Sequence, residues 1–180
     1  MQVLVLTGSA HRKGMSALLA EKFIEGAEEA GHNVIRIDTA FKNVHHCLGC
    51  LKCNGGENPC VLKDDMTDIG QTIEQSDVVV FAFPIYYHLM PMTLKAVLDR
   101  FYAFDSRLVG AHKKAFMFST GWDPAESNFA PMRAWFKSDM DYLQWEMMGE
   151  LNVGGYLTRE ELEQSDYPQK AYEMGKSLKG

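Results

Sequence analysis

The sequence predicts an α/β fold in which helices cover both faces of a parallel β-sheet. Five short runs rich in β-branched and aromatic residues alternate with helical patterns along the 180-residue chain. Such alternation is typical of parallel sheets, because a helical crossover returns the chain to the same edge. The third run, DVVVFAF at residues 77–83, is apolar at nearly every position. A strand without polar alternation is expected at the centre of the sheet, where both faces are buried.

The individual elements follow from periodicity and end signals. The first helical pattern places Leu18, Phe23 and Ala27 on one face, and Gly31 follows it as a C-terminal stop. Asp65 is a candidate N-cap of the second helix. Strands are expected at residues 2–6, 33–37, 77–83, 114–118 and 151–156. Helices are expected at about residues 15–30, 65–75, 91–102 and 127–148, with a last one beginning near 167.

Composition indicates one globular domain over residues 1–180, with an irregular, cysteine-rich loop at about 42–63. The net charge is −6, and no long basic stretch points to nucleic acid as a partner. The longest apolar run, residues 78–87, is far shorter than the roughly 20 residues of a membrane helix. The first residues lack the basic start and long apolar stretch of a signal peptide, so we expect a cytoplasmic protein.

The segment TGSAHRKGMS at 7–16 joins the first strand to the first helix and predicts a phosphate site. A helix N-terminus offers free N–H groups and the positive end of a dipole. Gly8 and Gly14 let the backbone turn closely around an anion, and Ser9 and Ser16 can donate hydroxyl hydrogen bonds. Arg12 adds charge. An ordinary serine-capped turn is the alternative interpretation.

The identity of a phosphate ligand is narrowed by patterns that the loop lacks. Neither the P-loop spacing G-x4-G-K-[ST] nor the dinucleotide pattern G-x-G-x-x-G occurs at residues 7–16. Asp38, however, ends the second strand, where a ribose-binding acid can stand in a Rossmann domain. A Rossmann nucleotide-binding domain therefore stays open as a minor alternative, with a local structural role for Asp38 as the simpler account.

The first loop resembles the phosphate loop of the NAD(P)H-dependent FMN reductases, which have a flavodoxin-like fold and commonly read G-S-P-R-x-x-G-N-[ST] at this place. The chain departs from this pattern at Ala10, His11 and Met15, and Arg12 can take over the displaced basic role. The resemblance implies a three-layer sandwich with strand order 2-1-3-4-5. It also implies that the FMN phosphate is bound by Ser9, His11, Arg12, Gly14, Met15 and Ser16.

Two later loops carry the same resemblance more specifically. The segments FPIYY at 83–87, MP at 90–91 and KAVLDR at 95–100 look like the family's P-[IV]-Y-x…MP…K-x-x-[IL]-D-R, and STGW at 119–122 looks like its short Thr/Gly loop. A flavin ring needs apolar walls and backbone hydrogen bonds at its heteroatoms. The implied ring contacts are Pro84, Ile85, Tyr86, Tyr87, Thr120, Gly121 and Trp122. We interpret Asp99 and Arg100 as a solvated helix end or a subunit contact.

Four cysteines, Cys47, Cys50, Cys53 and Cys60, lie within fourteen residues. Such clustering favours a metal or redox site over a disulfide framework. The two-residue gaps suit an iron–sulfur centre, although Pro59 precedes the last cysteine where ferredoxins have C-x3-C-P. The motif resembles that of the iron–sulfur flavoproteins, which implies a 4Fe–4S cluster beside FMN. Metal-free thiols and zinc remain alternatives, and we interpret the preceding histidines, 45 and 46, as loop residues.

These observations predict an FMN-dependent oxidoreductase that passes electrons from NAD(P)H, or from a redox protein, to an unknown acceptor. Because the flavin performs the redox chemistry itself, no protein acid or base is assigned as catalytic. A non-catalytic electron carrier of the flavodoxin type uses the same pocket and is the alternative function. Resemblance to the family also implies a homodimer or higher homo-oligomer.

Overall fold

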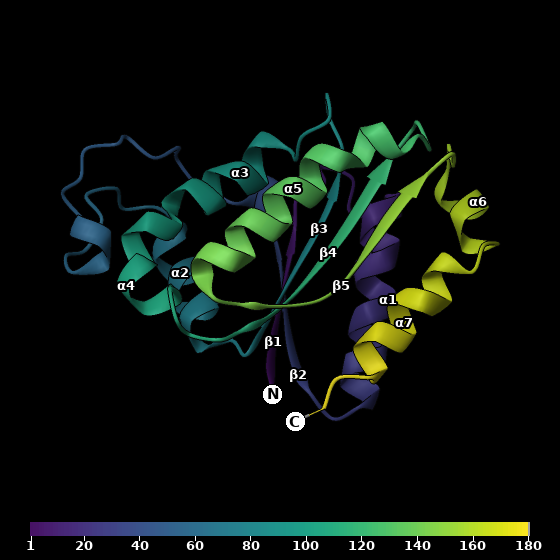
Figure 1. Cartoon of the computed structure of the whole chain (residues 1–180), viewed down its shortest axis with the longest axis horizontal. Helices are drawn as coiled ribbons and strands as arrows, with labels where there is room; N and C mark the ends of the chain where they lie inside the picture. The colour runs from purple at the N-terminus through teal and green to yellow at the C-terminus, as the bar shows by residue number, and fades with distance from the viewer. Residues whose placement is uncertain (180) are drawn as a thin grey trace.

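The computed structural model describes residues 1–179 and contains a five-stranded sheet between two helical layers (Figure 1). All neighbouring strands pair in parallel, in the order β2-β1-β3-β4-β5. This order confirms the predicted three-layer, flavodoxin-like sandwich. The strands are β1 (Gln2–Thr7), β2 (Asn33–Asp38), β3 (Val78–Pro84), β4 (Lys114–Gly121) and β5 (Glu146–Gly154).

Helices cover both faces of the sheet, with α1 and α7 on one side and α3 and α5 on the other (Figure 1). The helices are α1 (Met15–Glu29), α2 (Met66–Gln75), α3 (Met92–Asp99), α4 (Asp105–Leu108), α5 (Glu126–Leu143), α6 (Arg159–Glu163) and α7 (Tyr167–Lys176). Short 3₁₀ turns are η1 (Thr39–Phe41), η2 (Asn54–Gly56) and η3 (Arg100–Phe104). Within residues 1–179, none of the helices has the length and apolarity that a bilayer crossing requires.

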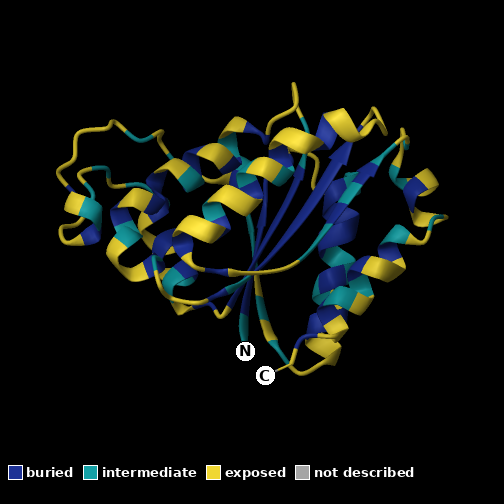
Figure 2. Ribbon diagram, in the orientation of Figure 1, coloured by how far each residue is buried: buried dark blue, intermediate teal, exposed yellow. Residues whose placement is uncertain are grey.

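The period-two geometry of the strands divides the core into two halves. On β3, Val79 and Phe81 pack toward α2, α3 and α5, whereas Val78 and Val80 pack toward α1 and α7. Residues 78–83 are all buried, as Figure 2 shows for the central strands. The uninterrupted apolar run in the sequence therefore reflects burial on both faces, as predicted.

The layer formed by α1 and α7 depends on two glycines. A Cβ on Gly26 of α1 would lie 2.1 Å from the carbonyl oxygen of Tyr172, and a Cβ on Gly175 of α7 would lie 2.1 Å from that of Phe23. Each helix thus presents a glycine to the backbone of the other. The two backbones approach so closely that any side chain at either position would push the helices apart.

The structure corrects several expected boundaries. The expected helix at 127–148 is too long, because α5 ends at Leu143 and Gln144 adopts a left-handed conformation (φ 58°). Strand β5 begins at Glu146 instead of Leu151 and ends at Gly154. The expected helix at 91–102 divides into α3 and the tighter turn η3. Helix α6 has only five residues and was not predicted.

Asp65 is the N-cap residue of α2, as predicted, but its side chain makes no capping hydrogen bond to the helix. Its carboxylate instead accepts the N–H of Asn43 across the loop, at 2.8 Å. The preceding residue, Asp64, accepts the N–H of Met66 at 3.2 Å. The two adjacent acids therefore join the start of α2 to the segment that precedes the cysteines.

Candidate functional site

An open pocket of about 750 Å³ lies at the carboxyl ends of the central strands. It combines the loop after β1 with the ends of β3 and β4, as expected for ligand sites in parallel α/β sheets. Its volume falls within the usual range of roughly 300–1,000 Å³ for ligand pockets. The predicted residues that line it are Ser9, His11, Arg12, Gly14, Met15, Ser16, Pro84, Tyr86 and Thr120.

The loop after β1 wraps closely around the start of α1. The Ser9 hydroxyl accepts the N–H of His11 at 3.0 Å, and the N–H of Gly14 donates to the carbonyl of His11 at 3.0 Å. Ser9, in the loop, and Ser16, in the first turn of α1, are both buried. The first turn of α1 contains no acidic residue, so the positive end of its dipole meets no carboxylate there. This geometry suits an anion at the helix N-terminus.

Arg12 is held beside this loop by an aromatic ring. Its guanidinium carbon lies 4.2 Å from the centre of the Phe41 ring. Asp38 accepts hydrogen bonds from the Thr7 hydroxyl and from Arg36 Nε, both at 2.7 Å. Burial would raise the pKa of Asp38, but these hydrogen bonds and the arginine charges lower it below its usual value. The carboxylate is thus satisfied by its neighbours, which is the local structural role considered above.

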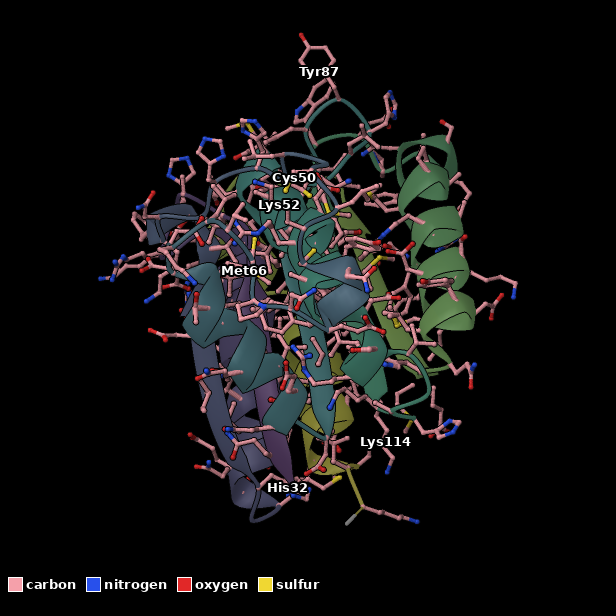
Figure 3. All side chains as sticks on the ribbon, turned by 90° about the vertical axis from the view of Figure 1, so that its left-hand side faces the viewer. His32, Cys50, Lys52, Met66, Tyr87 and Lys114 are labelled. Carbon is pink, nitrogen blue, oxygen red and sulfur yellow. The ribbon has the colours of Figure 1, made fainter. Side chains whose placement is uncertain are left out.

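The loop after β3 is a tight reversal that separates its two tyrosines. Tyr86 and Leu89 exchange backbone hydrogen bonds of 2.8 and 3.1 Å, and the two residues between them have positive φ. Tyr86 lines the pocket, whereas Tyr87 is 99% exposed and projects from the end of the molecule (Figure 3). Ile85 lies outside the pocket lining, and its N–H donates to the carbonyl of Thr120 at 2.7 Å.

The loop after β4 contributes mainly its backbone and Thr120. Gly121 is the last residue of β4, where a Cβ would lie 2.4 Å from Nδ2 of Asn128. Trp122 is exposed and, like Gly121, lies outside the pocket lining. Of the three residues predicted in this loop, Thr120 lines the pocket. Gly121 and Trp122 do not line it, so Thr120 is the residue by which this loop contacts the pocket.

Sequence analysis missed one wall of the pocket. Residues 157–160, which lead from the segment after β5 into α6, also line the pocket, as do Ala10 and Lys13 of the loop after β1. Arg159 is fixed there by ion pairs to Glu21 and Glu163, both at 2.7 Å. The capping pattern T-x-x-E at 158–161, which the sequence analysis did not use, is the signal that predicts a helix start here.

The cysteine loop is closed at its base by the acids that precede α2. Asp64 accepts the N–H of His45 at 2.9 Å, and the N–H of Asp65 donates to the carbonyl of Asn43 at 3.0 Å. The loop extends beyond α2 and α4, away from the sheet (Figure 1). Cys50 lies nearer to the end that carries Tyr87 than to the opposite end of the molecule (Figure 3).

All four cysteines are free thiols, and all four line one small pocket of about 30 Å³. Its other walls include Leu48, Leu51 and Val61, and the N–H of Gly49 lies 3.5 Å from Cys47 Sγ. The two histidines at 45 and 46 are not among its lining residues. In the described part of the chain, no three His, Cys, Asp or Glu side chains converge closely enough to hold a single metal ion.

Arg100 reaches this pocket from η3 and corrects the expectation that it is a solvated helix end. Its side chain is 2% exposed and donates to Asp64 at 2.9 and 3.2 Å and to the His45 carbonyl at 3.1 Å. Burial would lower the pKa of Arg100, but Asp64 and, secondarily, Cys60 raise it above its usual value. Asp99, by contrast, is partly exposed and pairs with Lys95.

Comparison with known proteins finds sequence relatives among the iron-sulfur flavoproteins. An iron-sulfur flavoprotein of Archaeoglobus fulgidus is 27% identical over 107 residues, which cover 59% of this chain and 48% of that protein. Another from Methanosarcina thermophila is 34% identical over 104 residues, covering 56% and 52%. The chain thus spans about half the length of these curated relatives.

A solved structure shows the same fold. The NAD(P)H:quinone oxidoreductase from Methanothermobacter marburgensis superposes with a TM-score of 0.71 at 21% identity, covering 100% of this chain and 96% of that one. The profile of the family described as NADPH-dependent FMN reductase matches residues 1–131, which include the loops after β1, β3 and β4 and the cysteine loop. The chain belongs to the NADPH-dependent FMN reductase family.

Proposed function

We propose that this protein is an FMN-dependent oxidoreductase that takes electrons from NAD(P)H and delivers them to an acceptor. The observation that carries this proposal is the pocket at the strand ends, where the N-terminus of α1 and the loops after β3 and β4 meet. Family membership supports FMN as the cofactor. Bound FMN would supply the redox chemistry, because its ring exchanges electrons in pairs or singly.

The protein residues bind and orient this cofactor. Ser16 and the free N–H groups of α1 are placed to hold the phosphate, with Ser9 shaping the loop. Pro84, Tyr86 and Thr120 line the same pocket and would contact the flavin ring. The Rossmann alternative has no support, because Asp38 is engaged by Thr7 and Arg36.

Two measurements test the proposal against its alternative. The purified protein should bind FMN in a one-to-one ratio and oxidise NADPH or NADH in steady state with a quinone or free flavin as acceptor. An electron carrier of the flavodoxin type would bind FMN but oxidise neither nucleotide. A protein that binds no FMN would contradict both.

We further propose that the four cysteines hold a 4Fe–4S cluster, which would exchange single electrons. The donor set fits, since four thiols and no carboxylate line the pocket, apolar side chains surround them, and an N–H group points at one sulfur. The space between the thiols is only about 30 Å³, so the loop must open to admit a cluster. Positive φ values at Gly49, Gly55 and Gly56 give it backbone freedom for this.

Anaerobic reconstitution with iron and sulfide tests the cluster. About four iron and four sulfide should bind per chain, and Cys50→Ser should abolish this ratio while FMN stays bound. Asn58→Ser, an exposed change in the same loop, is the matched control and should retain iron. Wild-type protein that binds no iron would leave the loop as a metal-free thiol site, and zinc uptake would support the remaining alternative.

We propose finally that the chain is one domain that assembles as a homodimer or higher oligomer. Large apolar side chains beside the pocket, including Tyr87, Leu89, Met92 and Trp122, are exposed. Analytical ultracentrifugation should show more than one chain per particle. A monomer at micromolar concentration would contradict this assembly.

A further inference from the structure

A buried ion pair lies between the cysteine pocket and the base of its loop. Arg100 and Asp64 are 2% and 6% exposed and are joined by two hydrogen bonds. Asp64 also accepts the N–H groups of His45 and Met66. Its carboxylate is therefore fully engaged by the loop base, whereas Arg100 continues past it into the wall of the pocket.

One nitrogen atom of Arg100 makes no hydrogen bond within the described part of the chain. Its Nε is buried and has no hydrogen-bond partner among residues 1–179. A buried donor without a partner costs free energy, so it marks a place where a negatively charged or accepting group is expected. The loop's lysines, Lys52 and Lys63, are exposed to water, which screens their charge. Of the described pocket-lining residues, Arg100 is the one that carries a fixed positive charge.

We propose that Arg100 tunes the cysteine pocket electrostatically: its buried charge stabilises the electron that a 4Fe–4S cluster held by the four cysteines takes up, and Asp64 opposes it. This inference rests on the cluster proposed above. Reduction adds one electron and no proton to the site. Dithionite supplies this electron in the experiment below. Net charge and hydrogen bonds to sulfur set the potential of such centres, and low dielectric strengthens both effects.

Substitutions of the two partners separate this role from a purely structural one. Arg100→Gln removes the positive charge and leaves Asp64, so the cluster should become harder to reduce. Asp64→Asn leaves Arg100 uncompensated, so the cluster should become easier to reduce. We expect each shift to be at least tenfold in the one-electron equilibrium constant, which is about 59 mV, with opposite signs. The double variant should return close to wild type.

Redox titration of the anaerobically reconstituted holoprotein, followed by the EPR signal of the reduced cluster, measures these shifts. Arg107→Gln is the matched control, because Arg107 also ties the loop, through the Gly56 carbonyl at 2.5 Å, but is partly exposed and paired with Glu74. It should change the constant by less than twofold. Arg100→Lys keeps the charge and should remain near wild type.

Shifts of the same sign in the two single variants, or no shift, would overturn the inference while leaving the cluster in place. If Arg100→Gln binds no iron, Asp64→Asn decides: a tenfold shift toward easier reduction supports the inference, and any other result overturns it. Wild-type protein without iron overturns the cluster and this inference together.

Discussion

Replacing Ser16 with alanine tests the phosphate site without disturbing the fold. Ser16 is the second residue of α1 and is 2% exposed, at the wall of the strand-end pocket. A hydrogen bond to a charged acceptor contributes about 1.5–3 kcal/mol. The loss of one such bond corresponds to an FMN affinity that is roughly 10- to 150-fold weaker. Alanine is a better helix former than serine, so the cofactor-free protein should melt no earlier than wild type.

Fluorescence titration with FMN and with riboflavin makes the test specific. Riboflavin lacks the phosphate, so Ser16→Ala should leave its affinity unchanged while FMN binding weakens. Ser138→Ala, on the exposed side of α5, is the matched control and should change neither. Equal losses for both ligands, or an unchanged affinity for FMN, would show that the phosphate does not bind at the start of α1.

Three further outcomes are expected. Tyr86→Ala should weaken FMN binding by roughly 2- to 13-fold, which corresponds to the loss of about 0.5–1.5 kcal/mol of aromatic contact. Tyr87→Ala should leave FMN binding unchanged, because this side chain is exposed outside the pocket. A larger effect of Tyr87→Ala than of Tyr86→Ala would place the flavin ring outside the pocket. Gly26→Ala should destabilise the fold by at least about 1–3 kcal/mol, because the added Cβ would meet a carbonyl of α7. Glu25→Ala is the control and should leave the melting temperature unchanged. An unchanged melting temperature for Gly26→Ala would refute the close packing of α1 on α7. Asp38 has a lowered pKa, so its stabilisation is present above about pH 4 and lost as the pH falls through its folded value. Asp38→Asn should therefore lower the melting temperature at pH 7. The difference in melting temperature between wild type and variant should become smaller as the pH falls below about 4, and a difference that does not change with pH would contradict this prediction.

The architecture was predictable because its signals are local and redundant. The apolar run at 77–83 indicates a central strand, and the spacing of Leu18, Phe23 and Ala27 indicates one face of a helix; all are buried as expected. Gly31 ends α1 with φ 85° and hydrogen bonds back to the last turn. Each of these features depends on a few neighbouring residues, so the sequence alone is sufficient.

What escaped prediction depends on contacts between distant segments. The burial of Arg100 requires Asp64 and the cysteine loop, which lie 36 residues or more away along the chain. The different directions of Tyr86 and Tyr87 depend on positive φ values at Tyr87 and His88. Neither residue is a glycine, so the sequence does not predict this conformation. Residues 157–160 line the same pocket as the loop after β1, although the two segments are far apart along the chain. Sequence patterns carry little information about such contacts between distant segments.

The strand-end pocket and the cysteine pocket are structurally separate, so a substitution in one should leave the other intact. Helix α3 separates them: Leu94, in its first turn, packs against Gly8 of the phosphate loop, and Arg100 follows its last residue at the cysteine pocket. Eight residues of helix span about 12 Å. The cysteine loop is largely exposed (Figure 2), with Cys53 and Gly56 among its buried residues. Asp64 closes the loop at its base by accepting the N–H of His45. A loop attached in this way leaves the sheet and the strand-end pocket intact, so loss of the cysteines should abolish a cluster without loss of the flavin.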